Sequence, residues 1–109
     1  MKKFLLSLLV SLFALNAHAG GTATFVPANP YFMPAGIILM TTPGGAIAGA
    51  PACATQQGFA IDASTPAGKV QLSAVLTAYA MGRQIAVYGT GACNVWGDRE
   101  TVNYLQIVG

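Results

Sequence analysis

The side chains that could do chemistry are few, and the two cysteines are the most informative of them. Cys53 and Cys93 are the only cysteines among 109 residues, so one intramolecular pairing can form. A catalytic thiol or a zinc site would need histidine or more ligands than the chain offers, whereas an oxidising compartment favours a disulfide. Closing a loop of about 40 residues stabilises a fold by roughly 4 kcal/mol in the chain-entropy model. We therefore expect a Cys53–Cys93 disulfide and no metal site.

Groups for acid–base catalysis are scarce. The single histidine, His18, lies in an N-terminal segment that we expect to be removed. Three carboxylates remain, and Asp98 and Glu100 are two residues apart in a predicted turn, far from Asp62. Residue type alone leaves a glycosidase-like pair of Asp62 with Asp98 or Glu100 open, but solvated or capping carboxylates are the simpler interpretation. The chain also lacks a phosphate-binding glycine motif, so we expect no enzyme and no cofactor.

Residues 1–19 have the layout of a secretory signal peptide. Two lysines precede an apolar run over residues 4–15, and Ala17-His18-Ala19 forms an A-x-A cleavage site. The apolar run is too short for a good membrane span. We expect export through the Sec pathway, cleavage after Ala19, and a mature single domain of residues 20–109 in the periplasm or outside the cell.

The predicted mature chain has no net charge. Because its few charges balance, electrostatic attraction to a polyanion is weak, and we expect no nucleic-acid partner. The cations are Lys69, Arg83 and Arg99, and the anions are Asp62, Asp98 and Glu100.

Ser64-Thr65-Pro66 is the clearest local signal in the chain. A hydroxyl there can accept a hydrogen bond from the first amides of a helix, and proline suits the first helical turn. Gly82 supplies a C-terminal stop, so the sequence predicts a helix over Pro66–Met81.

Two stripes of side chains follow this helix. Leu72, Val75, Leu76 and Tyr79 recur at helical spacing and predict the face that packs on the core. The other stripe has no charge, although a solvated face usually carries Lys and Glu. It is either a plain alanine-rich surface or a face for self-association, and it consists of Val70, Ala74, Thr77 and Met81.

Short apolar segments bounded by proline and glycine predict five strands, with the helix between the third and the fourth. This connectivity matches a small OB-fold-like barrel, in which closure protects the strand edges. An open α+β sheet with one helix is the alternative. The predicted strands cover residues 23–26, 36–42, 58–62, 84–88 and 101–108.

The second half of the chain resembles the C-terminal part of the receptor-binding B subunits of AB-type bacterial toxins, of the cholera, pertussis and subtilase-cytotoxin kinds. The resemblance lies in the order of elements and in residue type. A helix leads through a glycine turn into an alternating strand, a Cys–Trp element, a polar turn and a final apolar strand. These are residues 66–81, 84–88, Cys93-Asn94-Val95-Trp96, residues 97–100 and residues 101–108.

This resemblance implies a secreted binding module that forms a ring-shaped homo-oligomer, recognises a glycan or protein receptor, and has an A-type subunit as a partner. The alternative is a periplasmic structural or interaction protein with the same fold. Aromatic faces beside polar groups are where sugars dock, and the candidates are Tyr88, Trp96, Asp98 and Arg99. In a ring, the charge-free helix stripe would face a neighbouring subunit.

Overall fold

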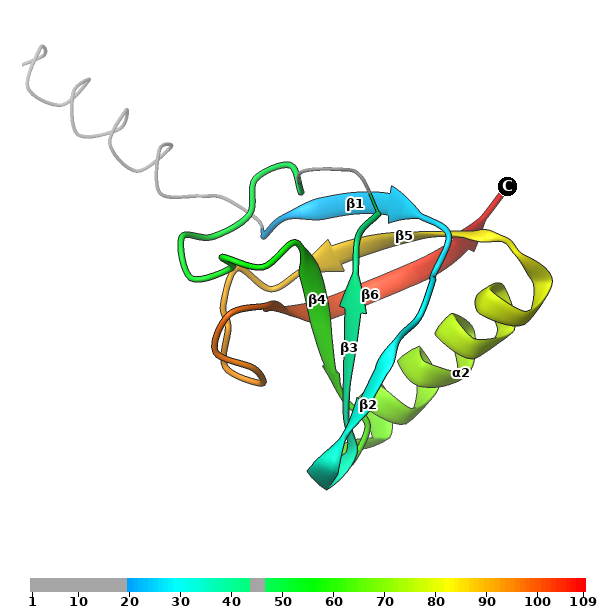
Figure 1. The fold of residues 1–109 in the computed structure, drawn as a ribbon, viewed down its shortest axis with the longest axis horizontal. Helices are drawn as coiled ribbons and strands as arrows, with labels where there is room; N and C mark the ends of the chain where they lie inside the picture. The colour runs from blue at the N-terminus through cyan, green and yellow to red at the C-terminus, as the bar shows by residue number, and fades with distance from the viewer. Residues whose placement is uncertain (1–19, 44–46) are drawn as a thin grey trace, which may run out of the picture.

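The computed structural model describes residues 20–43 and 47–109 and shows a mostly β protein with one long helix (Figure 1). The predicted signal peptide lies outside the described residues. The strands are β1 (Thr22–Phe25), β2 (Tyr31–Met33), β3 (Ile37–Thr41), β4 (Gly58–Asp62), β5 (Gln84–Gly89) and β6 (Glu100–Val108). The helices are the single turn η1 (Pro34–Gly36) and α2 (Pro66–Met81).

The six strands form one mixed sheet in the order β1-β5-β6-β4-β3-β2. Neighbouring strands are antiparallel except β4 and β6, which run parallel and pair Phe59 with Glu100. Between β5 and β6 a bulge leaves Asn103 unpaired, and the Gln71 side chain of α2 donates a hydrogen bond to the Asn103 carbonyl oxygen over 3.0 Å.

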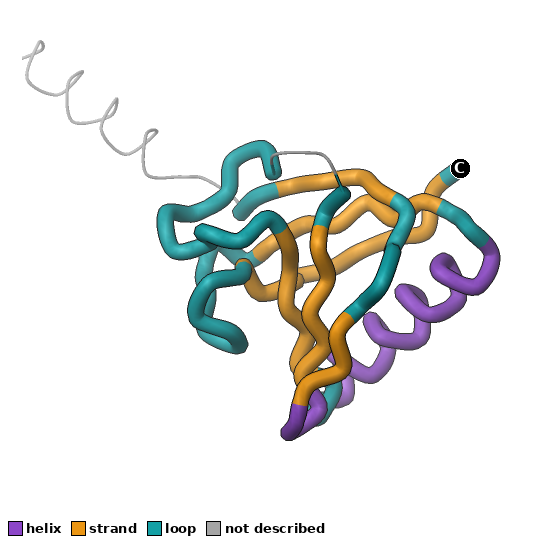
Figure 2. Tube along the Cα trace, viewed as in Figure 1, coloured by secondary structure: helices purple, strands orange, loops and turns teal. Residues whose placement is uncertain are grey.

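The sheet curls strongly around a single core (Figure 2). The rings of Phe25 in β1 and Phe59 in β4 stack with centroids 6.5 Å apart. In a flat sheet these strands, which have two others between them, would lie about 14 Å apart. The curl therefore brings β1, at one edge of the strand order, onto the same cluster as β3 and β4. Its buried members are Phe25, Ile38, Met40, Ile47, Phe59, Ile61, Val75, Ala78, Ile85, Val87 and Val102.

The hydrogen-bonded order is open, so the closed five-stranded barrel is not confirmed and the open sheet with one helix describes what is present. The additional strand is β2, a three-residue strand between Pro30 and Pro34. The two edge strands, β1 and β2, are consecutive in the chain. Pro27 and Pro30 separate them, and since proline has no N–H to donate, a continuous ladder cannot form there.

The helix begins and ends where the sequence predicts. The Thr65 hydroxyl oxygen accepts a hydrogen bond from the Gly68 amide over 2.9 Å, and Gly82 ends the helix with φ +65°. In the preceding turn the hydroxyl and the amide of Ser64 donate to Asp62, which lowers the pKa of that carboxyl below its usual value. The N-terminus of α2 is thus fixed by a chain of local hydrogen bonds.

The core-facing stripe of α2 is only partly the predicted one. Val75 is buried and Leu72 packs against the core, but Leu76 and Tyr79 are 41% and 48% exposed. The small residues Gly68 and Ala78 are buried instead. Gly68 lies so close to the end of β4 that a Cβ would overlap the Asp62 carbonyl oxygen. This close approach turns the small-residue side of the helix toward the sheet.

Loss of the Thr65 cap should destabilise the protein. We expect Thr65→Ala to lower the free energy of unfolding by about 1 kcal/mol, because the Gly68 amide loses its acceptor. Urea unfolding followed by circular dichroism measures this. Ser73→Ala is the matched control, since the Ser73 hydroxyl donates within the helix to the Lys69 carbonyl oxygen. Equal stability of the two variants would contradict the assigned cap.

Candidate functional site

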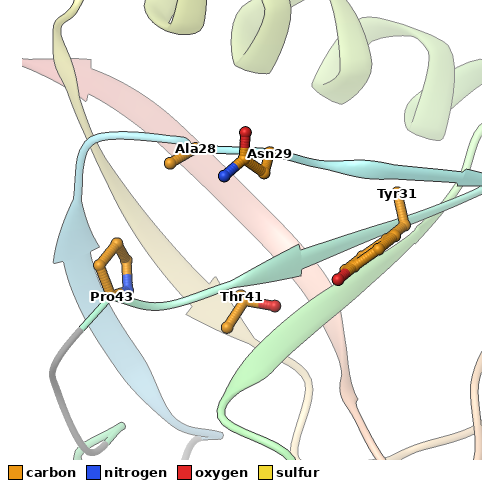
Figure 3. A pocket seen from close by; sticks show the side chains of 5 residues that line it. All are labelled: Ala28, Asn29, Tyr31, Thr41 and Pro43. Carbon is orange, nitrogen blue, oxygen red and sulfur yellow. The ribbon is translucent and has the colours of Figure 1, made fainter.

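A cavity of about 280 Å³ lies between the end of β3 and the segment that joins β1 to β2 (Figure 3). Ala28 and Asn29 line it from the joining segment, Tyr31 from β2, and Thr41 and Pro43 from the end of β3.

Local backbone structure creates this opening. Asn29 has φ +49°, a left-handed conformation that asparagine tolerates better than most residues, and the chain then enters Pro30. The pairing of β2 with β3 starts at Tyr31, which lies opposite Leu39. Since β3 continues to Thr41, its last residues have no partner in β2, and the cavity occupies the place where the strands part.

The lining offers hydrogen-bonding groups without charge. Tyr31 is 56% exposed and presents its ring and hydroxyl, while Asn29 supplies an amide and Thr41 a hydroxyl. An apolar ring face beside neutral donors and acceptors suits a ligand that has both a C–H face and hydroxyl groups. A sugar ring has this chemistry.

The ligand residues predicted from the sequence lie elsewhere, and they remain a prediction. Tyr88 is in β5, and its ring stacks on the ring of Tyr104 in β6 with the two centroids 4.5 Å apart. Trp96, Asp98 and Arg99 share one turn in the β5–β6 loop, where the Arg99 amide donates to the Trp96 carbonyl oxygen. None of the four lines the Tyr31 cavity.

Arg99 is held closely in that turn. Its guanidinium pairs with Asp98 over 3.3 Å, and its side chain is 13% exposed. Arg99 Nε is buried without a hydrogen-bond partner, and a Cβ at Gly58 would lie 3.2 Å from it. The charges of Asp98 and Arg99 are therefore largely paired with each other within the turn.

The predicted self-association stripe borders a second, apolar cavity of about 360 Å³ between α2 and β6. Val70 and Ala74 line it together with Tyr104 and Leu105. Val70 is 71% exposed, and Thr77 and Met81 are also exposed. The stripe is exposed except at Ala74, which is partly covered, and its role in self-association stays a prediction.

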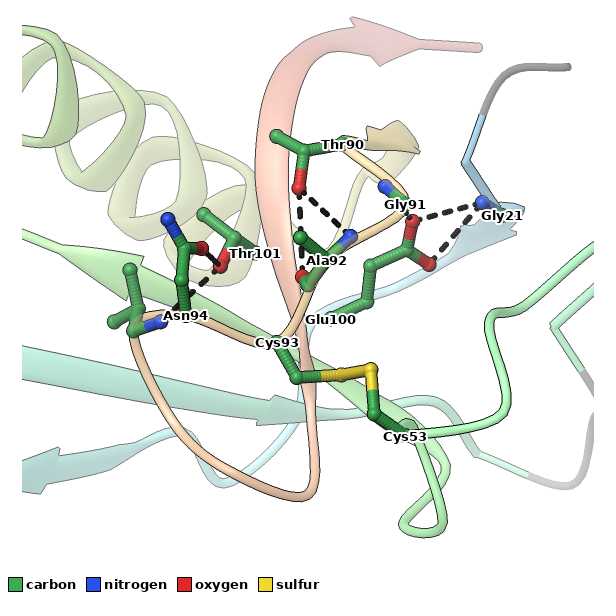
Figure 4. Close-up of a disulfide and its surroundings, with 10 residues drawn as sticks. Gly21, Cys53, Thr90, Gly91, Ala92, Cys93, Asn94, Glu100 and Thr101 are labelled. Carbon is green, nitrogen blue, oxygen red and sulfur yellow. Dashed lines mark hydrogen bonds between the residues drawn. A yellow bond between two sulfur atoms is a disulfide. The ribbon is translucent and has the colours of Figure 1, made fainter. Parts of the chain in front are cut away.

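Glu100 is not a solvated carboxylate, since it is buried and accepts hydrogen bonds from backbone amides. Its side chain is fully buried, and both oxygens accept hydrogen bonds from the Gly21 amide, at 3.1 and 2.9 Å (Figure 4). The Gly91 amide donates to Oε2 over 2.7 Å. The Gly20-Gly21 pair and the glycines around Thr90 were the available signal, because glycine permits such close backbone approach.

Cys53 and Cys93 form the predicted disulfide (Figure 4). The bond joins the segment before β4 to the β5–β6 loop, with Cα atoms 6.2 Å apart. The Gln56 amide also donates to the Asp98 carbonyl oxygen over 3.1 Å, so the two loops are joined twice.

We expect Cys53→Ser/Cys93→Ser to lower the free energy of unfolding by about 2–4 kcal/mol, because the unfolded chain is no longer restrained by the bond. Thermal unfolding of the double variant beside the oxidised protein measures the loss. Intact mass after alkylation without reductant provides the control. Labelling of both thiols in the native exported protein would contradict the assignment.

Comparisons with family models, with curated proteins and with solved structures find no significant match to this chain. Over residues 20–43 and 47–109, no His, Cys, Asp or Glu side chains gather in a group that could hold a metal ion. In the same part of the chain, no helix is long and apolar enough to cross a membrane.

Proposed function

We propose that this chain is a small exported binding module of the toxin B-subunit type, which recognises a glycan through the cavity beside Tyr31. The observation that carries the proposal is a neutral cavity lined by an exposed aromatic ring, an amide and a hydroxyl. Binding is favoured over catalysis because Glu100, one of three carboxylates in the predicted mature chain, already accepts backbone amides with both oxygens.

The architecture that accompanies this proposal is an OB-type barrel whose first strand is interrupted. If β1 and β2 are two halves of one strand, five strands remain, with α2 between the third and the fourth. Three features support this: the curl of the sheet, the parallel pairing of β4 with β6, and the direct chain connection between the two edge strands. The disulfide is compatible with the oxidising compartment that export would provide.

Removing the Tyr31 ring should abolish most of the affinity. A glycan array identifies the sugar that the mature protein binds, and calorimetry then compares variants. We expect Tyr31→Ala to weaken binding about tenfold, which is ~1.4 kcal/mol, by loss of the stacking surface. Tyr79→Ala is the control, because Tyr79 is a similarly exposed tyrosine that does not line the cavity.

Affinity should change little between low and moderate salt, because no charged side chain lines the cavity. Unchanged binding by Tyr31→Ala, or a lack of binding to any glycan, would refute the glycan proposal. A steep salt dependence would instead indicate an acidic partner.

We propose also that the module assembles into a closed ring through the helix stripe Val70, Ala74, Thr77 and Met81. Heterologous contacts close into a ring when their rotation permits, and each subunit would then cover the exposed apolar side of its neighbour. The A-type subunit implied by the resemblance is the proposed partner of this ring.

Placing a charge on the stripe should dissociate the ring. We expect Val70→Glu to reduce the mass measured by light scattering at micromolar concentration to that of a monomer, with the fold intact because Val70 is mostly exposed. Ala80→Glu is the matched control, because Ala80 is exposed about 90° around the helix from the centre of the stripe. A monomeric wild-type protein would overturn the ring.

The second candidate function is a periplasmic structural or interaction protein. The apolar cavity between α2 and β6 favours it, since such a surface can receive a protein partner without any sugar site. A monomer that binds no glycan would make this the better description.

A further inference from the structure

The buried carboxylate of Glu100 has no cation beside it in the described part of the chain. Its hydrogen bonds come from the uncharged amides of Gly21 and Gly91. The salt bridge that forms within residues 20–43 and 47–109 joins Arg99 to Asp98. A buried charge is costly unless it is paired as well as hydrogen-bonded, so this site lacks a positive group.

Gly20 lies directly against this carboxylate. A Cβ at Gly20 would overlap Oε2 of Glu100, the carbonyl oxygen of Gly89 and the amide nitrogen of Gly91. A Cβ at Gly89 would overlap the same carboxylate, and one at Gly91 would lie 3.7 Å from Cα of Gly20. The backbones at Gly20 and Gly89 therefore lie so close to the carboxylate that neither position has room for a side chain.

The predicted signal-peptide cleavage would supply the missing cation at this place. Hydrolysis breaks the peptide bond between Ala19 and Gly20, and water provides the hydroxyl of the new Ala19 carboxylate and a hydrogen of the new Gly20 amine. At neutral pH that α-amine is largely protonated. The α-nitrogen and the position of a Cβ are each one bond from Cα, so the new ammonium lies within a few ångströms of Glu100.

We propose that Glu100, with the backbone at Gly20, Gly21, Gly89 and Gly91, is a binding site for the protein's own α-ammonium group, which maturation creates. The proposal rests on the predicted cleavage after Ala19 and is independent of the glycan site. It explains why a carboxylate is buried among glycines, and it requires the cut to fall at one bond, because a further residue would carry the charge away from Glu100.

The test compares three forms of the mature chain: one that begins at Gly20, one that retains Ala19 as an additional first residue, and one whose Gly20 amine is converted by transamination to an uncharged glyoxylyl group. We expect the second and third forms to lose at least about tenfold in the folding equilibrium constant, ~1.4 kcal/mol, measured by urea unfolding. In a Glu100→Gln background the three forms should agree within about twofold, because the ion pair is already absent.

A second measurement applies even if Glu100→Gln does not fold. The α-amine of the native protein should react with an amine-labelling reagent at least about tenfold more slowly than in urea, with the exposed Lys69 as the internal reference. Equal stability of the three forms, equal losses in both backgrounds, or an α-amine that reacts as fast in the native protein as in urea, relative to Lys69, would each overturn the proposal. So would an exported protein whose mass shows another first residue. Glycan binding enters none of these measurements, so the two proposals fail separately.

Discussion

The packing of Phe25 on Phe59 is the contact on which the rest of the structure depends. It requires β1 to lie over a core whose other side is β3 and β4, so the sheet must curl rather than spread. The chain then has to pass from one edge of the strand order to the other, between β1 and β2. The connecting segment contains Pro27 and Pro30, which cannot donate ladder hydrogen bonds. It therefore separates from the end of β3, and the cavity beside Tyr31 lies between the two.

The same curl explains why a carboxylate is buried. The start of β1 and the β5–β6 loop meet at Glu100, the first residue of β6, where the backbone amides of Gly21 and Gly91 need acceptors. One carboxylate serves three hydrogen bonds there, because glycines leave room for it. The site is therefore a joint between segments that are 79 residues apart in sequence.

The elements whose ends are set by residues close together in sequence could be predicted from the sequence. The helix follows from Ser64-Thr65-Pro66 and Gly82, and β4 from its alternating side chains, and both have the predicted bounds. The short β2 was missed because three residues between prolines carry no periodic pattern. The core side of α2 was displaced because the contact of Gly68 with the end of β4, which no helical periodicity contains, sets its rotation.

The candidate sites show the same division. The disulfide was predictable because two cysteines allow one pairing. The burial of Glu100 was not, because Asp98-Arg99-Glu100 has the composition of a solvated turn and the partners of Glu100 are distant in sequence. The Tyr31 cavity depends on the exact residue at which β2 and β3 part, and this is a property of the register rather than of any motif.

The disulfide has a mechanical consequence, because it lies at one end of the molecule only. Beside it, the Gln56–Asp98 hydrogen bond and the amides on Glu100 tie the same group of loops. At the far end, the start of α2 is fixed by local hydrogen bonds, and the Ala63 amide donates to the Gly36 carbonyl oxygen of the η1 turn (Figure 1). No disulfide forms at that end in the described part of the chain, so β2, which carries Tyr31, is held in place by its pairing with β3 and by packing alone.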